Sequence, residues 1–357
     1  MCDEAKARGR LIAATLDGAW RDKASQPQSE KAPDEIASLL LASGSAALGW
    51  YRIRHSDLRT SDVAVQLQQA YRLHTLQSAI HERSLTQLVL FLRSAGLDPL
   101  LGKGWAIARL YPEPGLRPYG DFDLYVRPEE YEATSAALRR PGAPPCAVDL
   151  HRGAAELDDR GFDDLYARSR LAGLGDAEVR IFGPEDHLRL LCLHMFRHGA
   201  WRPLWLVDVA VALESRPADF DWDYFLSGDQ RRSDWTACAI GLAHQLLGAE
   251  VSGTPIVERA RNLPRWLVPA VLGQWGRGQV PHGTRRPMSS YLRDPAGVLD
   301  ALRVRWPNAI EATVGVHGAF NDLPRLPFQL GECLRRTGGF VAQLPALLGN
   351  AVRYGER

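Results

Sequence analysis

Two carboxylates stand two positions apart at the start of an apolar segment, in Gly-Asp121-Phe-Asp123-Leu-Tyr-Val. Because side chains alternate along a strand, we expect Asp121, Asp123 and Tyr125 to share one face, while the apolar residues between them pack the other. Two carboxylates whose Cα atoms lie roughly 6.5 Å apart repel each other unless a cation lies between them. Mg²⁺ prefers one or two carboxylates together with phosphate oxygens. The spacing therefore indicates a site for a divalent cation that also contacts phosphate.

A third acid follows on a separate short segment, Cys146-Ala-Val-Asp-Leu150, which we expect to be a strand. If this strand lies beside the first, Asp149 reaches the other two carboxylates. Asp149 would then complete a second metal site or act as the base on an acceptor hydroxyl. His151 follows Asp149 by two positions, so the alternation places it on the same face.

A tight turn, Gly102-Lys103-Gly104, connects the short strand Leu100-Leu101 to a helix expected from about Trp105 to Leu110. Lys103 carries a point charge that suits a phosphate oxygen, and the backbone amides of Gly102 and Gly104 at the start of a helix can donate to phosphate. Arg117 could reach the β- or γ-phosphate with its planar fork. The alternative for Arg117 is an ion pair that orders its own loop.

The remaining segments are expected to position these groups within an α+β fold. Residues 1–33 are expected to form a polar segment with a short helix and a linker, and residues 34–95 two or three helices. We expect residues 96–182 to form the small mixed-sheet core, with a helix over Pro128–Arg139, and residues 183–357 to form a helical domain. After Asp163 we expect almost only helices: one opening at Pro184, one over Trp205–Leu213, and others within Pro255–Gly276, Pro295–Arg305 and Pro327–Tyr354.

The composition excludes several classes of protein. The 357 residues are 45% apolar and 24% charged, with a net charge of +1, so no overall field recruits nucleic acid or anionic lipid. The five cysteines include no C-x-x-C pair, which argues against a zinc ribbon or a disulfide framework. No apolar run reaches the roughly 18 residues of a membrane span, and the N-terminal residues lack a signal-peptide pattern. We expect a cytoplasmic protein that does not bind membranes.

Two further features of the C-terminal half have structural explanations. His194 and His198 lie four apart on one helix face and could bind zinc, but Met195 stands where the metalloprotease pattern needs glutamate. A buried histidine pair is the favoured interpretation. Asp208, on an otherwise apolar helix, is expected to cap that helix or to pair with His198 or Arg202.

Four motifs together resemble a family of uncharacterised bacterial nucleotidyltransferases within the DNA polymerase beta-like superfamily. They are Lys103-Gly104, Arg117-Pro-Tyr-Gly-Asp-Phe-Asp-Leu124, Val148-Asp-Leu-His151, and the histidine helix followed by Trp205-Leu-Val-Asp208. The resemblance covers roughly residues 60–350. It implies that Asp121, Asp123 and Asp149 bind Mg²⁺ or Mn²⁺ and that the turn binds a nucleoside triphosphate. Two departures are Gly102, where this family usually has a bulky apolar residue, and Trp105, where the superfamily often has a serine.

We therefore expect a Mg²⁺-dependent transfer of a nucleoside monophosphate from a triphosphate, ATP by default, to the hydroxyl of an unknown acceptor. The chain also resembles the nucleotidyltransferase toxins of abortive-infection systems, which act on transfer RNA or protein. A basic groove built from Arg139, Arg140 and Arg152 would favour nucleic acid. Two non-transferase functions stay open at this point: a non-catalytic nucleotide-binding scaffold, and a helical metal protein centred on His194 and His198.

Overall fold

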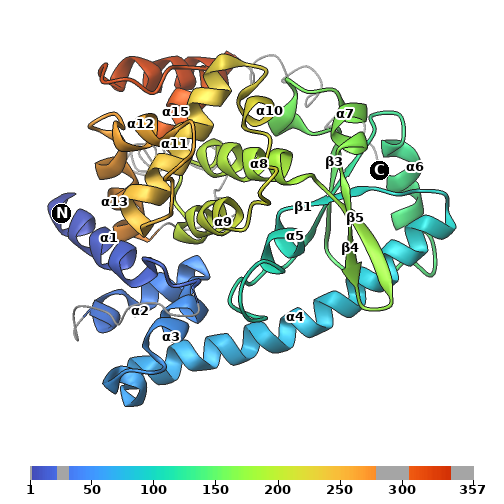
Figure 1. The fold of residues 1–357 in the computed structure, drawn as a ribbon, viewed down its shortest axis with the longest axis horizontal. Coiled ribbons are helices and arrows are strands. Elements are labelled where there is room, and N and C mark those ends of the chain that lie inside the picture. Colours follow the sequence, from blue (N-terminus) through green and yellow to red (C-terminus); the bar gives the residue numbers. More distant parts are fainter. Residues whose placement is uncertain (1, 22–31, 279–304, 339–357) are drawn as a thin grey trace, which may run out of the picture.

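The computed structural model describes residues 2–21, 32–278 and 305–338. It combines a five-stranded mixed sheet with a large body of helices, which confirms the α+β class (Figure 1). Sheet and helical body lie side by side, and the 33-residue helix α4 (Asp62–Ser94) runs along both. At 1.5 Å per residue this helix is about 50 Å long, so one element connects the N-terminal helices to the sheet.

The sheet has the strand order β3-β2-β1-β5-β4. Its centre is β1 (Leu100–Gly102), which pairs antiparallel with β2 (Phe122–Val126) and parallel with β5 (Ala177–Ile181). On one side β3 (Val148–Arg152) runs parallel to β2, with Asp123 opposite Asp149 and Tyr125 opposite His151. The predicted neighbourhood of these two strands is therefore confirmed, with their acids in register.

The other edge of the sheet corrects the expectation that almost only helices follow Asp163. A hairpin of β4 (Arg170–Leu174) and β5 stands there, joined by the two-residue turn Gly175-Asp176. Gly175 has φ +57°, as tight hairpin turns of this length require. Buried side chains alternate along both strands, through Ala172 and Leu174, then Val179 and Ile181. In the sequence this period of two is visible in β5, where apolar and charged residues alternate from Ala177 to Ile181.

Most predicted helices are confirmed with shifted ends. The N-terminal helices before α4 are α1 (Cys2–Leu16), α2 (Ala32–Ser43) and α3 (Ala46–Ile53), and the core contains α5 (Gly104–Ala108), α6 (Tyr131–Leu138) and α7 (Phe162–Ala167). The C-terminal body has α8 (Pro184–Arg197), α9 (Pro203–Glu214), α10 (Trp222–Leu226), α11 (Gln230–Leu247), α12 (Val257–Arg261), α13 (Leu267–Arg277), α15 (Ala309–Gly315) and a helix over 326–338. The predicted linker around 25–33, the helix expected at Pro295–Arg305 and the end of Pro327–Tyr354 fall wholly or largely outside the described residues.

Helix α1 belongs to the packed body despite its polar composition. It buries Ile12 and Leu16 and lies against α13, which is far from it in the sequence. The crossing is close because glycines face backbone on both helices: a Cβ at Gly9 would lie 2.1 Å from the Leu272 carbonyl oxygen, and one at Gly276 would lie 1.7 Å from that of Ala5. None of the described helices combines the length and the apolar character needed to cross a membrane.

Candidate active site

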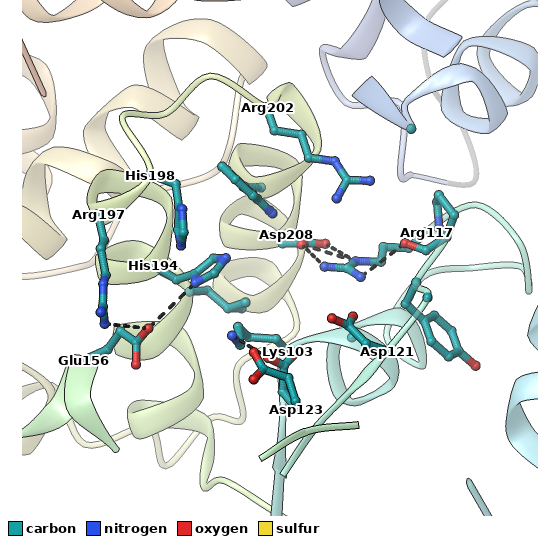
Figure 2. Close-up of a pocket in the computed structure, with 18 of the residues that line it drawn as sticks. Lys103, Arg117, Asp121, Asp123, Glu156, His194, Arg197, His198, Arg202 and Asp208 are labelled. Carbon is teal, nitrogen blue, oxygen red and sulfur yellow. Dashed lines mark hydrogen bonds and ion pairs between the residues drawn. The ribbon is translucent and has the colours of Figure 1, made fainter. Parts of the chain in front are cut away.

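A cavity of about 730 Å³ lies where three parts of the fold meet. The sheet contributes the ends of β2 and β3 with the turn after β1, the N-terminal helices contribute Gly44 and His74, and α8 and α9 form the remaining wall. Figure 2 shows charged side chains from the sheet region and from α8 and α9 facing the same space. The described residues that line the cavity include all three predicted acids, Lys103, Gly104 and Arg117.

Asp123, Asp149 and His151 form a compact cluster on the sheet. The parallel register of β2 and β3 sets the two acids side by side, and His151 follows on the same face. His151 Nε2 lies 3.1 Å from Asp123 Oδ1 and 3.2 Å from Asp149 Oδ2. One ligand atom from each residue falls within 4.8 Å of the others, a spacing compatible with a shared metal ion. The imidazole ring stacks on Tyr125 at 4.3 Å, which fixes its orientation.

Lys103 provides the positive charge beside this cluster. Its Nζ lies 2.5 Å from Asp123 Oδ1, and both side chains are 9% exposed. Burial alone would raise the pKa of Asp123, but the hydrogen bond with His151 and the charge of Lys103 outweigh burial and lower it. Asp123 is therefore ionised at neutral pH, and its charge is balanced by a lysine that a cation could replace.

The turn that carries Lys103 has an unusual backbone. Lys103 itself has φ +45°, a region that residues with a side chain rarely occupy, and Gly104 follows with φ +26°. A Cβ at Gly104 would lie 3.3 Å from the Asp121 carbonyl oxygen, so the turn approaches the acidic segment closely. Such strain occurs most often at ligand sites, and here it brings the lysine to the cluster.

Gly102 differs from the expectation that its amide would bind phosphate. It lies within β1 opposite Asp123, and it is not among the described residues that line the cavity. A Cβ at this position would lie 2.8 Å from Tyr125 Cε2 and 3.1 Å from Leu190 Cδ2. Gly102 has no room for a side chain because aromatic and aliphatic side chains fill that space.

Replacing Gly102 with alanine is expected to lower the free energy of unfolding by about 1–3 kcal/mol, the usual cost of overpacking a core. Gly173 is the matched control, because it also lies in a strand and its Cβ would meet nothing within 4 Å among the described residues. Urea unfolding of Gly102→Ala and Gly173→Ala measures both. Equal stability of the two variants would show that Gly102 is not needed for packing.

Asp121 lies apart from the metal-compatible cluster. The strand begins at Phe122, so Asp121 precedes it, is exposed, and is not among the three described residues that meet within 4.8 Å. It still lines the cavity, and Figure 2 shows its carboxylate between Asp123 and Arg117. Alternation would place Asp121 on the same face as Asp123 only if the strand began at residue 121. The strand begins one residue later, so the rule does not apply to Asp121.

Arg117 is held inside the protein by Asp208. Its Nη2 lies 2.8 Å from Asp208 Oδ2, its Nε donates to the same carboxylate, and its Nη1 donates to the Pro118 carbonyl. Tyr111 donates a further 2.8 Å hydrogen bond to Asp208 Oδ1. The expectation that Asp208 caps its helix or pairs with His198 or Arg202 is therefore wrong. The geometry matches the alternative for Arg117, an ion pair that orders its loop.

Helix α8 contributes a second group of titratable side chains. Arg197 Nη1 lies 3.2 Å from Glu156 Oε1, and His194 Nδ1 lies 3.9 Å from the same oxygen. Burial would raise the pKa of Glu156, but His194, Lys103 and Arg197 together lower it to about 2. Burial, and then the neighbouring His194, lower the pKa of His198 to about 4. At neutral pH, Glu156 is therefore ionised and His198 is neutral.

No motif in the sequence points to Glu156 and Arg197, which come together only through the fold. Among the described residues, the group close enough to share a metal contains neither His194 nor His198. Their rings lie 4.5 Å apart and both contact Trp205, which favours the interpretation as a packed histidine pair.

Comparison with models of known protein families gives a match. No curated protein and no solved structure gives a significant match to the chain. A family model described as "uncharacterised nucleotidyltransferase" matches residues 29–248, more than half of the chain, from α2 to the end of α11. The matched region includes the acid–histidine cluster, the Lys103 turn, Arg117 and Asp208. The chain therefore belongs to the uncharacterised nucleotidyltransferase family.

Proposed function

We propose that this protein transfers a nucleoside monophosphate from a nucleoside triphosphate to an acceptor hydroxyl, with Mg²⁺ or Mn²⁺ bound at Asp123, Asp149 and His151. The observation that carries the proposal is the position of this cluster beside the Lys103 turn in one large cavity. Two carboxylates and an imidazole suit either ion, and the imidazole adds affinity for Mn²⁺. ATP is the default donor.

The residues have distinct roles in the proposed reaction. The acceptor oxygen forms a bond to the α-phosphorus, the bond from that phosphorus to the β-phosphate bridging oxygen breaks, and pyrophosphate leaves. Asp149, half exposed in the cavity, takes the proton of the acceptor hydroxyl. Lys103 moves from Asp123 to a phosphate oxygen. A bound divalent ion supplies charge stabilisation at the transferring phosphoryl group. Asp121 is proposed to bind the same ion from the edge of the cavity, and Gly104 to donate its amide to phosphate.

The arginines expected to form a basic groove for nucleic acid are not among the described residues that line the cavity. Arg152 is paired with Glu132 on the surface, and the described lining of the cavity includes none of Arg139, Arg140 and Arg152. These positions give the nucleic-acid alternative no support at the site, although they leave macromolecular acceptors open as proposals. The presence of the three acids and of Lys103 favours catalysis over a scaffold role. A cytoplasmic location and kinship with the DNA polymerase beta superfamily stay predictions, as do the domain boundaries at 33, 95 and 182.

Calorimetric titration of each of the four nucleoside triphosphates, with Mg²⁺ and with EDTA, tests the proposal. We expect one or more triphosphates to bind only with Mg²⁺, and Asp149→Asn to weaken that binding at least tenfold. Asp149 suits the test because its side chain is 55% exposed and it has no contact with Lys103 among the ion pairs of the described residues. Asp219→Asn, at an exposed position outside the cavity lining, is the matched control. Triphosphate affinity that is unchanged both by EDTA and by Asp149→Asn would contradict the proposed site.

A further inference from the structure

Arg202, at the start of α9, is a preorganised cation in the cavity wall. Its Nε donates to the Ser43 carbonyl oxygen at 2.7 Å, which ties the guanidinium to the end of α2. Gly44, with φ +74°, makes room for it, because a Cβ there would lie 2.5 Å from Arg202 Nη2. The side chain is therefore held in place by backbone, in a position that a larger residue at 44 would disturb.

Charge pairing sets Arg202 apart from the other cations of the cavity. Among the described residues, four lysine or arginine side chains line it, and three of them have a carboxylate: Lys103 at 2.5 Å, Arg117 at 2.8 Å and Arg197 at 3.2 Å. Within residues 2–21, 32–278 and 305–338, Arg202 makes no such ion pair. Burial, and then the charge of Arg117, lower the pKa of Arg202 to about 10, so it stays charged at neutral pH without a paired carboxylate.

The acids of the cavity show the opposite imbalance. Asp121 makes no ion pair with the described residues, and the one that Asp149 makes with them is to His151. Figure 2 shows Arg202 and Asp123 on opposite sides of the cavity, with Asp121 and Arg117 between them. The described lining of the cavity thus offers acids without a lysine or arginine partner near the sheet, and across from them a guanidinium that makes no ion pair. A metal–triphosphate complex has the complementary arrangement, with the cation at one point and anionic terminal phosphates beyond it.

Resting on the proposed function, we infer that Arg202 binds the terminal phosphates of the nucleoside triphosphate. Its Nη1 and Nη2 can donate to two oxygens of one phosphate, the geometry that favours arginine over lysine at such sites. Hydrogen bonds to charged groups contribute about 1.5–3 kcal/mol, which corresponds to a loss of roughly 10- to 100-fold in affinity when they are removed. A nucleoside monophosphate lacks the terminal phosphates, so its affinity is expected to be independent of Arg202.

The test compares ATP, AMP and inorganic tripolyphosphate, each titrated with Mg²⁺ into the wild type, Arg202→Met and Arg202→Lys. We expect Arg202→Met to lower the affinity for ATP and for tripolyphosphate 10- to 100-fold and to change the affinity for AMP by less than twofold. The affinities of Arg202→Lys for ATP and tripolyphosphate are expected to lie between those of the wild type and Arg202→Met. The ligand-free Arg202→Met protein is expected to melt within a few degrees of the wild type, since a lost hydrogen bond is offset by removal of an unbalanced charge. Arg265→Met, which removes an exposed charge outside the cavity, is the control.

Several results would overturn the assignment. One is that Arg202→Met binds ATP and tripolyphosphate as tightly as the wild type. Another is that Arg202→Met loses as much affinity for AMP as for ATP. A third is that the wild type does not bind tripolyphosphate. Inorganic phosphate that still binds through Arg202 when ATP saturates the site would instead assign Arg202 to a phosphate on the acceptor, which also contradicts the inference. Failure of the proposed function is recognised separately, by ATP binding that Asp149→Asn leaves unchanged.

Discussion

Asp123→Asn is expected to abolish Mg²⁺-dependent triphosphate binding and, at the same time, to lower the free energy of unfolding by about 3–5 kcal/mol, the usual cost of breaking a buried ion pair. The second effect follows because Lys103, 9% exposed, would keep its charge without the carboxylate that lies 2.5 Å away. The first follows because Asp123 is the buried member of the metal-compatible cluster. Urea unfolding and calorimetry measure the two losses on the same preparation.

The double variant Lys103→Met with Asp123→Asn separates these effects. It removes the unbalanced charge, so we expect it to recover most of the lost stability, whereas triphosphate binding stays lost because both ligand-binding groups are gone. Recovered binding in the double variant would show that Asp123 acts only as a partner for Lys103. Full stability in the single variant would show that the buried pair is not formed in solution.

Asp208→Asn is expected to destabilise the protein by about 3–5 kcal/mol, because it leaves the Arg117 guanidinium buried opposite a neutral group. Asp208 is fully buried, accepts from Arg117 at 2.8 Å, and also accepts from Tyr111. The pair joins the loop before Asp121 to α9, so it couples the sheet core to the helical body. Chemical unfolding of the purified variant measures the loss.

An exposed ion pair of this chain gives the matched control for burial. Arg152 Nη2 lies 2.5 Å from Glu132 Oε1, but the two side chains are 53% and 76% exposed. Glu132→Gln is expected to cost at most about 1 kcal/mol, since solvent screens such pairs. Similar losses for Asp208→Asn and Glu132→Gln would contradict the view that burial makes the Arg117–Asp208 pair structural.

Local patterns in the sequence predicted much of the site. The alternation along Phe122–Val126 and Val148–Arg152 placed Asp123, Asp149 and His151 on one face, and the parallel register brings them together. Proline and acidic residues correctly marked the start of α8. Alternation failed for Asp121 because it requires the residue to lie within the strand, and pairing begins one residue later.

Features that depend on distant contacts could not be predicted from the chain. Arg117 and Asp208 are 91 positions apart, and no local pattern connects them. Gly102 has no room for a side chain because Tyr125 and Leu190 fill the space above it, which is a property of packing. Arg202 stands out as a candidate phosphate ligand only because the other cations of the cavity are paired and because the backbone at Ser43 and Gly44 holds its side chain. The hairpin of β4 and β5, by contrast, has a local signal in the alternation along β5 and in its Gly-Asp turn.

A crystal structure of the protein with Mn²⁺ and a non-hydrolysable ATP analogue tests the central claim most directly. We expect an anomalous manganese peak between the carboxylates of Asp123 and Asp149, ligated by His151 or within reach of it, with the α-phosphate beside it in the cavity. A nucleotide bound elsewhere, or manganese that avoids Asp123 and Asp149, would contradict the assignment of this cavity as the site of nucleotidyl transfer.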